Sequence, residues 1–169
     1  METRRKRSRV IEWQDPFEAM RAAPGKTGLE LLREISAGNI PPPPISRLMG
    51  FTAVHFEEGK AVFEGEPAEY LYNPIGVVHG GFAMTILDSA MGCAIHSTLG
   101  VGERYTTLET KTNFVRPITI DTGRVRCEAV LVHRGTTIGT SEGRLFAIDS
   151  GKLLAHGSST CLIMPAGNA

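Results

Sequence analysis

The sequence predicts an α+β fold in which a curved antiparallel sheet wraps around one long central helix, with a short helical extension at the N-terminus. The chain between Gly80 and Ser97 has no proline and almost no charge, and its apolar residues cover most of a helical wheel. A helix that is apolar nearly all round is a buried helix. Six further stretches have the composition of strands, and two of these carry unusually small residues on one face.

The central helix carries one carboxylate, on a surface that is otherwise apolar. At 1.5 Å per residue the segment would be ~27 Å long, which is enough to cross a small domain. Residues spaced by 4, 3 and 4 positions lie on the same face of a helix. The face formed in this way is small and polar, since it consists of Gly81, Thr85, Asp88 and Gly92. Burying an unpaired charge is costly, so Asp88 needs a partner or a function.

The N-terminal region is predicted to be an arm with one short helix. Thr27 is a good N-cap and Glu30 is its capping-box partner, which predicts a helix over Gly28–Ala37 that ends at Gly38-Asn39. The apolar residues around Asp15-Pro16 have a spacing that is also compatible with a short docked helix: Trp13, Phe17 and Met20.

A run of prolines separates this arm from the main domain. Pro41–Pro44 is predicted to be a stiff polyproline linker, and a partner-binding segment is the less favoured alternative. The chain therefore divides into an arm over residues 1–45 and one main domain over residues 46–165.

The charge of the chain favours neither a nucleic acid nor a membrane as partner. Lys+Arg and Asp+Glu both number 18, so there is no overall charge. A basic segment at the N-terminus is interpreted as a solvated tail, in preference to a contact with phosphate or a membrane surface: Arg4, Arg5, Lys6, Arg7 and Arg9. No secretory signal follows it, and no apolar stretch reaches the ~18–20 residues of a membrane span.

Strands are predicted both before and after the central helix in the sequence. Phe51–Glu57 and Lys60–Glu66 flank the turn Glu58-Gly59, which is a hairpin signal, and Pro67–Gly76 is a loop. Four more strands should follow the helix as a meander with tight turns at Arg134-Gly135 and Ser150-Gly151. They are Tyr105–Val115, Gly123–His133, Thr136–Asp149 and Leu153–Met164.

Small residues line one face of the last two strands. They are Gly139, Ser141, Gly143 and Ala147 on one strand and Ala155, Gly157, Ser159 and Cys161 on the next. Glycine weakens a strand unless something must approach it closely. The apolar helix is the only bulky element available, so we expect it to pack against this face.

The cysteines and histidines do not predict a metal site. Cys93, Cys127 and Cys161 are odd in number, far apart and in apolar surroundings, which predicts buried free thiols and a reducing, cytoplasmic location. Neither residue type has metal-ligand spacing. No metal and no cofactor is expected.

One set of motifs resembles a known family. His79-Gly80-Gly81, then Asp88, then a strand that ends in Asn113-Phe114-Val115-Arg116-Pro117, is similar to the hotdog-fold thioesterases of the phenylacetate-pathway (PaaI) type. The resemblance covers roughly residues 45–165. It implies the hotdog fold and an acyl-CoA thioesterase, in which coenzyme A is part of the substrate.

The chemistry of thioester hydrolysis fits the central helix independently. A helix N-terminus offers free N–H groups and a partial positive charge, so the Gly80 N–H is the expected donor to an oxyanion. Asp88 would act on water as a general base or attack as a nucleophile, and these alternatives stay open. The resemblance further implies that Asn73 contacts the carbonyl and that the Thr107 hydroxyl holds the water.

The resemblance also implies a site built across a dimer interface. Asn73 and Gly80 would come from one subunit, and Asp88 and Thr107 from the other. Gly80 and Asp88 are about 12 Å apart along one helix, which is too far for both to serve one small carbonyl. An exposed edge strand over Tyr105–Val115 would pair with its own copy. We therefore expect at least a homodimer, which relatives often double to a homotetramer.

The expected substrate-binding residues lie in three segments. His79 and Gly81 belong to the loop that enters the helix, where His79 is expected to orient the loop and not to act as a base. The coenzyme A arm would run along two further segments, in which Arg116 and Arg134 would hold phosphates. These segments are Phe114, Val115, Arg116 and Pro117, and the turn His133, Arg134, Gly135, Thr136 and Thr137.

Several alternatives remain at this stage. A hotdog hydratase or dehydratase would use a histidine with an acidic partner, and a non-catalytic hotdog protein would bind or sense acyl-CoA. A sensor of that kind follows a DNA-binding domain, for which residues 1–45 offer too little helix. Asp88 could be a structural aspartate, Thr107 a plain strand residue and Arg116 a surface charge. The acyl group, aryl or aliphatic, is open.

Overall fold

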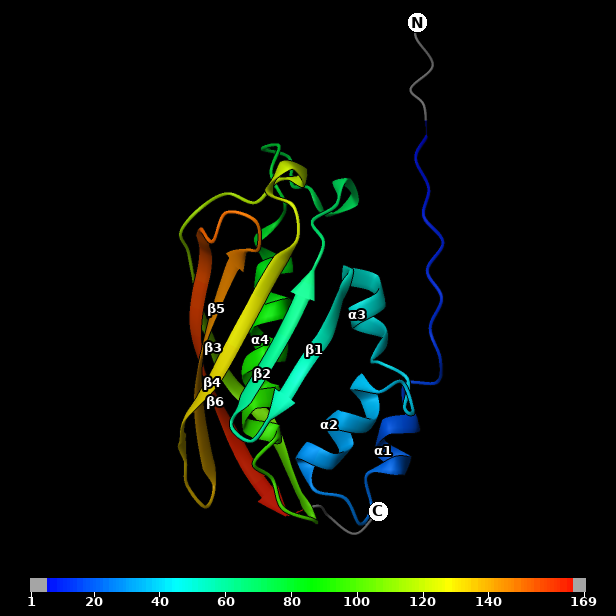
Figure 1. The fold of residues 1–169 in the computed structure, drawn as a ribbon, viewed down its shortest axis with the longest axis vertical. Coiled ribbons are helices and arrows are strands. Elements are labelled where there is room, and N and C mark those ends of the chain that lie inside the picture. Colours follow the sequence, from blue (N-terminus) through cyan, green and yellow to red (C-terminus); the bar gives the residue numbers. More distant parts are fainter. Residues whose placement is uncertain (1–5, 166–169) are drawn as a thin grey trace, which may run out of the picture.

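The sheet of this computed structural model curves around one long helix, α4 (Gly80–His96), as the sequence predicts (Figure 1). The structure describes residues 6–165. The sheet has six strands in the order β1-β2-β4-β5-β6-β3, and all neighbours are antiparallel. The predicted meander is therefore right for the last three strands only, because β3 pairs with β6 and not with β4. Their bounds are β1 Phe51–Glu57, β2 Lys60–Gly65, β3 Glu103–Phe114, β4 Val125–Arg134, β5 Ile138–Ala147 and β6 Leu153–Pro165.

The side chains of α4 are buried in the structure to the extent that its apolar sequence predicts. Ile86, Leu87, Ala90, Met91 and Ala94 are completely buried between the helix and the sheet. The helix is covered along its length because strands β2 to β6 all contact it. This burial makes α4 the centre of the hydrophobic core.

The small residues of β5 and β6 make room for this helix. A Cβ atom added to Gly139 would lie 2.9 Å from Cγ2 of Ile95, and one added to Gly143 would lie 3.0 Å from Cγ of Met91. The Ser141 hydroxyl donates a hydrogen bond of 3.0 Å to the carbonyl oxygen of Met91. The predicted packing of the helix on these strands is therefore confirmed.

Gly157 is an exception to this explanation. A Cβ atom at this position would overlap the carbonyl oxygen of Lys111 in the neighbouring strand β3, whereas the nearest atom of α4 would be at an ordinary contact distance of 3.6 Å. The space that Gly157 provides is therefore needed by the backbone of the edge strand and not by the helix.

Three short helices form the N-terminal extension: α1 (Glu18–Ala22), α2 (Gly28–Ser36) and α3 (Pro44–Met49). The capping box of α2 is confirmed, since the Thr27 N–H donates to the Glu30 carboxylate at 2.8 Å and the Glu30 N–H donates to the Thr27 hydroxyl at 3.3 Å. Helix α3 corrects the linker prediction. Pro44 is the first residue of that helix and not the last of a polyproline segment, because a proline fits the first helical position.

The extension packs against one side of the sheet. Figure 1 shows α2 and α3 beside β1. The Gly28 N–H donates a hydrogen bond of 2.9 Å to the carbonyl oxygen of Leu99, just beyond the end of α4. Leu31 and Leu32 of α2 are buried, and Leu32 belongs to the main hydrophobic cluster.

The basic N-terminal segment is not a freely solvated tail. The Arg9 guanidinium donates to the carbonyl oxygens of Leu48 and Arg47 at 2.9 and 2.7 Å, and it lies 4.1 Å from the centre of the Tyr70 ring. Arg7 pairs with Glu69 at 3.1 Å. The expected solvated tail is therefore only partly right: residues 6–10 are all exposed to solvent, but Arg9 binds the carbonyls at the end of α3. Arg4 and Arg5 lie outside the described residues.

Within residues 6–165, no helix combines the length and the apolar character needed to cross a membrane.

The tight contact at Gly157 gives the first prediction. Replacing Gly157 by Ala should lower the free energy of unfolding by about 1–3 kcal/mol, because a backbone carbonyl cannot yield as a flexible side chain can. Denaturant unfolding would measure the change. Ser158→Ala is the control, since Ser158 is exposed on the same strand. Equal stability of Gly157→Ala and the control would contradict the contact.

Candidate active site

The Asp88 carboxylate points from α4 toward the edge strand β3. It accepts a hydrogen bond of 2.9 Å from the Thr110 hydroxyl, and the Thr107 hydroxyl lies at 3.5 Å from the same oxygen. The structure thus brings Thr107 to Asp88, as the sequence predicts. Thr110, which sequence analysis missed, holds the carboxylate more closely.

A β-bulge explains why Thr110 was missed. Thr107 pairs with Cys161 and Glu109 with Thr160, so Leu108 is an extra residue in β3. Residues three apart normally point to opposite faces of a strand, but the bulge turns Thr107 and Thr110 toward the same helix. Alternation along β3 gives no signal of this, because only the pairing with β6 reveals the bulge.

The N-terminus of α4 presents a free hydrogen-bond donor. His79 is the N-cap, and its Nδ1 accepts from the Gly81 N–H at 2.9 Å, which supports the loop-orienting role. The Gly80 N–H donates no hydrogen bond within residues 6–165. A Cβ atom at Gly80 would lie 2.9 Å from the tip of the exposed Phe114 ring, so the glycine lets this ring lie close to the start of the helix. This N–H can therefore bind an anionic oxygen.

Asn73 organises the loop before α4. Its Oδ1 accepts from the N–H groups of Ile75 and Val77 at 3.1 and 3.3 Å. This leaves its amide NH₂ without an acceptor among residues 6–165. The side chain can hold the loop and donate to a ligand at the same time.

The donor groups share one cavity of about 420 Å³ with the end of β3 and the residues after it. Asn73, Gly80 and Arg116 all line it, and the Arg116 Nη1 donates to the carbonyl oxygen of Leu153 at 2.7 Å. The remaining lining residues are Val77, Val78, His79, Ala83, Phe114, Val115, Pro117 and Ile118.

Asp88 and Thr107 line a different cavity, of about 320 Å³. No residue lines both cavities. Within one chain, the donors at the start of α4 and the carboxylate two turns later therefore face separate spaces. This is the arrangement that the distance argument from the sequence predicts.

The thiol beside Asp88 is not a nucleophile at neutral pH. Burial, together with the nearby Asp88 carboxylate, raises the pKa of Cys93 to about 12. A thiol with this pKa stays protonated near pH 7, and the thiolate is the reactive form. Cys93 therefore does not compete with Asp88 for the role of nucleophile in this cavity.

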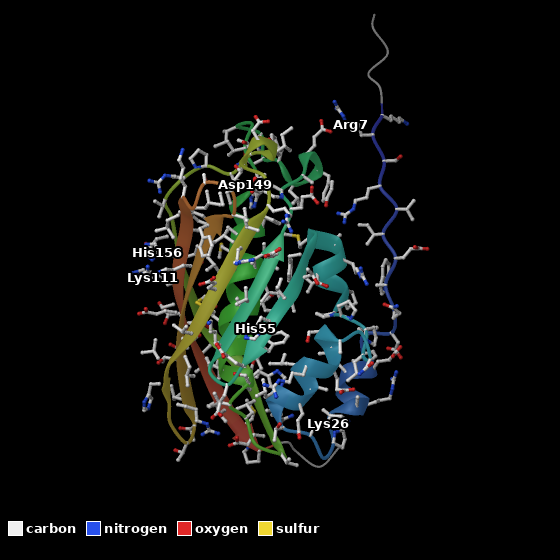
Figure 2. All side chains as sticks on the ribbon, viewed as in Figure 1. Arg7, Lys26, His55, Lys111, Asp149 and His156 are labelled. Carbon is white, nitrogen blue, oxygen red and sulfur yellow. The ribbon has the colours of Figure 1, made fainter. Side chains whose placement is uncertain are left out.

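None of the five histidines forms a hydrogen bond to Asp88 within residues 6–165. His55, His133 and His156 are exposed, and Figure 2 shows His156 and Lys111 on the outer side of the sheet. His96 is largely enclosed, and burial lowers its pKa to about 4, so it is neutral near pH 7. In the described residues, no group of three or more His, Cys, Asp or Glu side chains could hold a metal ion.

The turn His133–Thr137 does not meet Phe114–Pro117 within one chain. Ile138 and Thr106 both pair with Leu162 of β6, so the turn lies at the other end of the sheet, roughly 25 Å away along the strands (Figure 1).

Arg134 at this turn is engaged by two groups of its own chain. Its guanidinium pairs with Glu103 at 2.6 Å and also donates to the carbonyl oxygen of Gly135, and the bond to Arg134 holds the pKa of Glu103 below its usual range. The phosphate role of Arg134 stays a prediction, and in this structure its guanidinium is paired with Glu103. Sequence spacing could not reveal it, because Glu103 is 31 residues away.

Comparisons with known proteins agree on one family. A family model described as the thioesterase superfamily matches residues 75–154. Among curated proteins, no sequence matches this chain. A solved structure of conserved protein PA5202 from Pseudomonas aeruginosa is 33% identical with a TM-score of 0.65, and the match covers 71% of this chain and 93% of that one.

Two further structures carry names from phenylacetic acid degradation. The degradation protein PaaI from Thermus thermophilus is 28% identical with a TM-score of 0.64, and the match covers 70% of this chain and 97% of that one. A phenylacetic acid degradation-related protein from Ralstonia eutropha is 26% identical with a TM-score of 0.69, covering 77% and 97%. The present chain is similar to nearly the whole of each neighbour and has residues beyond them.

The enclosed imidazole gives a prediction about stability. An unfolded histidine titrates near pH 6.5, whereas folded His96 titrates at about 4, so lowering the pH through this window protonates the unfolded state first. The stability that depends on neutral His96 is therefore present above pH 6.5 and is lost as the pH falls toward 4. In wild type, His96 should account for about 1–2 kcal/mol of the decrease in the free energy of unfolding between pH 6.5 and 5. This part of the decrease should be absent in His96→Phe, as measured by denaturant titrations. His156→Phe, at an exposed position, should leave the slope as in wild type, and an unchanged slope in His96→Phe would refute the assignment.

Proposed function

This chain belongs to the thioesterase superfamily and is a thioester hydrolase with the hotdog fold, and from that premise we propose that it hydrolyses an acyl-coenzyme A to the free acid and coenzyme A. The observation that carries this proposal is the placement of Asp88, a carboxylate held by two threonine hydroxyls at the wall of an apolar cavity. No cofactor is needed, because coenzyme A is part of the substrate.

Asp88 supplies the proton transfer. In the general-base form, its carboxylate takes a proton from water while the water oxygen bonds to the thioester carbon. The tetrahedral intermediate then breaks its carbon–sulfur bond, and the leaving thiolate receives the proton from Asp88. Thr110 fixes the carboxylate at 2.9 Å, and the looser contact of Thr107, 3.5 Å, suits a hydroxyl that also holds the water. In the nucleophilic form the same carboxylate would attack the carbon directly.

The Gly80 N–H stabilises the oxygen that becomes negative in the intermediate. It lies at the positive end of α4 and has no acceptor within the described chain. The free amide NH₂ of Asn73 lines the same cavity and donates a second hydrogen bond. Arg116, at the edge of this cavity, binds a coenzyme A phosphate with the guanidinium N–H groups that Leu153 does not take.

The complete site requires two copies of the chain. The donors and the carboxylate line separate cavities, so the partner subunit's Asp88 acts with the Gly80 of this chain. Strand β3 is at the edge of the sheet and exposes Leu108 and Phe114, and Met84 of α4 is also exposed. These apolar groups favour self-pairing of β3 in a two-fold homodimer.

Antiparallel self-pairing would also bring together segments that are apart in one chain. The start of β3 in one copy lies beside the end of β3 in the other. The turn His133–Thr137 adjoins the start of β3, so in the dimer it approaches Phe114–Pro117 of the other subunit. Both segments can then contact coenzyme A, with Arg134 paired to Glu103 and Arg116 left for phosphate. A homotetramer would add a second contact between two such dimers.

The proposed cellular setting follows from the thiols. Cys93, Cys127 and Cys161 are all free, and burial raises the pKa of each. Free buried thiols suit a reducing compartment, which supports the cytoplasm as the proposed location.

The catalytic proposal predicts the effect of removing the carboxylate. Asp88→Asn keeps the shape but cannot accept a proton, so kcat should fall at least ~100-fold. Free thiol release from a series of acyl-CoAs would measure it. Glu142→Gln, at an exposed position of β5 outside the proposed interface strand, is the control and should keep full activity. Near-normal turnover of Asp88→Asn would refute the role, and binding of acyl-CoA without turnover in wild type would favour a sensor.

The shared site predicts complementation between two inactive variants. Asn73→Asp keeps an acceptor for the loop but removes the NH₂ donor, which makes it gentler than truncation. In a heterodimer of Asp88→Asn and Asn73→Asp subunits, one site carries both lesions and the other carries neither. Purified heterodimers should therefore recover about half of wild-type activity.

Light scattering on the same samples should give at least a dimeric mass at micromolar concentration. Homodimers of each variant are the controls and should stay inactive. An active monomer, or heterodimers that recover nothing, would exclude a site shared in this way.

A further inference from the structure

We propose that helix α2 and the proline linker after it form the outer wall of the acyl cavity and so limit the acyl group to an uncharged chain of roughly eight to ten carbons or an aryl group of similar length. This inference rests on the proposed thioesterase function. It assigns a role in substrate selection to a segment that precedes residues 75–154, the part of the chain that the family model matches.

The cavity that contains Asp88 has two unlike walls. One wall comes from α4 and β3 and carries the polar groups: Asp88, Ser89, Cys93, His96, Tyr105 and Thr107. The other is almost entirely apolar and comes from the extension together with β1 and β2. Its members from the extension are Ala19, Leu31, Leu32, Ile35, Pro42, Pro43 and Ser46. An apolar wall facing a catalytic carboxylate is the surface that an acyl chain needs.

The length of the cavity follows from the helix that lines it. Asp88 and His96 both line the cavity, and eight residues of α-helix span ~12 Å. With the thioester carbon beside Asp88, a chain running along α4 toward His96 has space for roughly eight to ten carbons, given carbon–carbon bonds of about 1.5 Å. The volume of about 320 Å³ agrees, since a cavity of ~150 Å³ already holds benzene.

The far end of the cavity favours an uncharged tail. His96 is neutral near pH 7 because burial lowers its pKa to about 4, and the Cys93 thiol is protonated. Tyr105, which packs against the His96 ring at 5.3 Å between ring centres, has its pKa raised by burial and is neutral too. Among residues 6–165, Asp88 is thus the one charged side chain that lines this cavity, and a charged substituent at the tail would have no counter-charge there.

The extension is held firmly enough to act as a wall. The Gly28 N–H bonds to the carbonyl oxygen of Leu99, and any Cβ atom at residue 28 would overlap the carbonyl oxygen of His96. This contact seats the first turn of α2 directly on the last turn of α4. The capping box of Thr27 and Glu30 fixes the same turn. The position of Leu31 and Ile35 over the cavity is therefore set by α4 itself.

Two substitutions in α2 test the wall from opposite directions. Ile35→Phe enlarges a side chain of the wall and so reduces the volume of the cavity. It should lower kcat/KM for decanoyl-CoA at least ~10-fold relative to butyryl-CoA, since one methylene in an apolar pocket changes kcat/KM by about 10-fold or more. Leu31→Ala removes volume from the wall and should shift the preference toward dodecanoyl-CoA. Arg33→Phe adds the same ring on the exposed side of α2 and should keep the wild-type profile.

Binding provides a readout that does not need turnover. Dissociation constants of the same acyl-CoA series, measured by calorimetry in the Asp88→Asn background, should show the same change in chain-length preference. Thermal unfolding confirms that each variant is folded. If neither kcat/KM nor the dissociation constants change with chain length in folded Ile35→Phe, the wall assignment is overturned while the thioesterase proposal stands. If wild type releases no thiol from any acyl-CoA, the thioesterase proposal fails, and the dissociation constants still decide the wall.

Discussion

The burial of one apolar helix is the constraint on which the rest of this structure depends. Helix α4 has hardly any polar surface, so the sheet must cover it on nearly every side, and the small faces of β5 and β6 let the sheet approach closely. The polar features of α4 that the proposed chemistry uses are its N-terminus and Asp88, and neither is fully buried. The chemistry of the site is therefore located at the places where burial of α4 is incomplete.

Much of this arrangement could be predicted from the sequence, because the signals are local. Four features depend on residues that are close in the chain. They are the apolar run of α4, the capping box of Thr27, the turn at Gly59 and the small residues on one face of β5. The relation of Asp88 to Thr107 followed from a family pattern. What could not be predicted depends on contacts across the chain: the β3 bulge that brings Thr110 to Asp88, the ion pair that occupies Arg134, and the docking of Arg9 on α3.

The division of the site between two cavities gives the edge strand a second role. Strand β3 provides the threonines for Asp88 from its middle and the lining of the donor cavity from its end. Its outer edge is unpaired within residues 6–165. In the proposed dimer this strand would support both halves of the site and also pair with its own copy, so it would link assembly to catalysis through the same backbone.

Helix α2 packs on the end of α4, and this places the residues that would select the acyl group in a different part of the chain from those that would catalyse the reaction. The side chains that would carry out the chemistry lie in the central helix and β3, whereas the apolar wall opposite them lies in a segment joined through a linker. Substitutions at Leu31 and Ile35 change this wall, whereas Leu32 of the same helix belongs to the main core. Over evolutionary time, descendants of such a chain could exchange or remodel the appendage and acquire new acyl preferences while inheriting the reaction unchanged, with Gly28 as the position that must be kept for any such wall to fit.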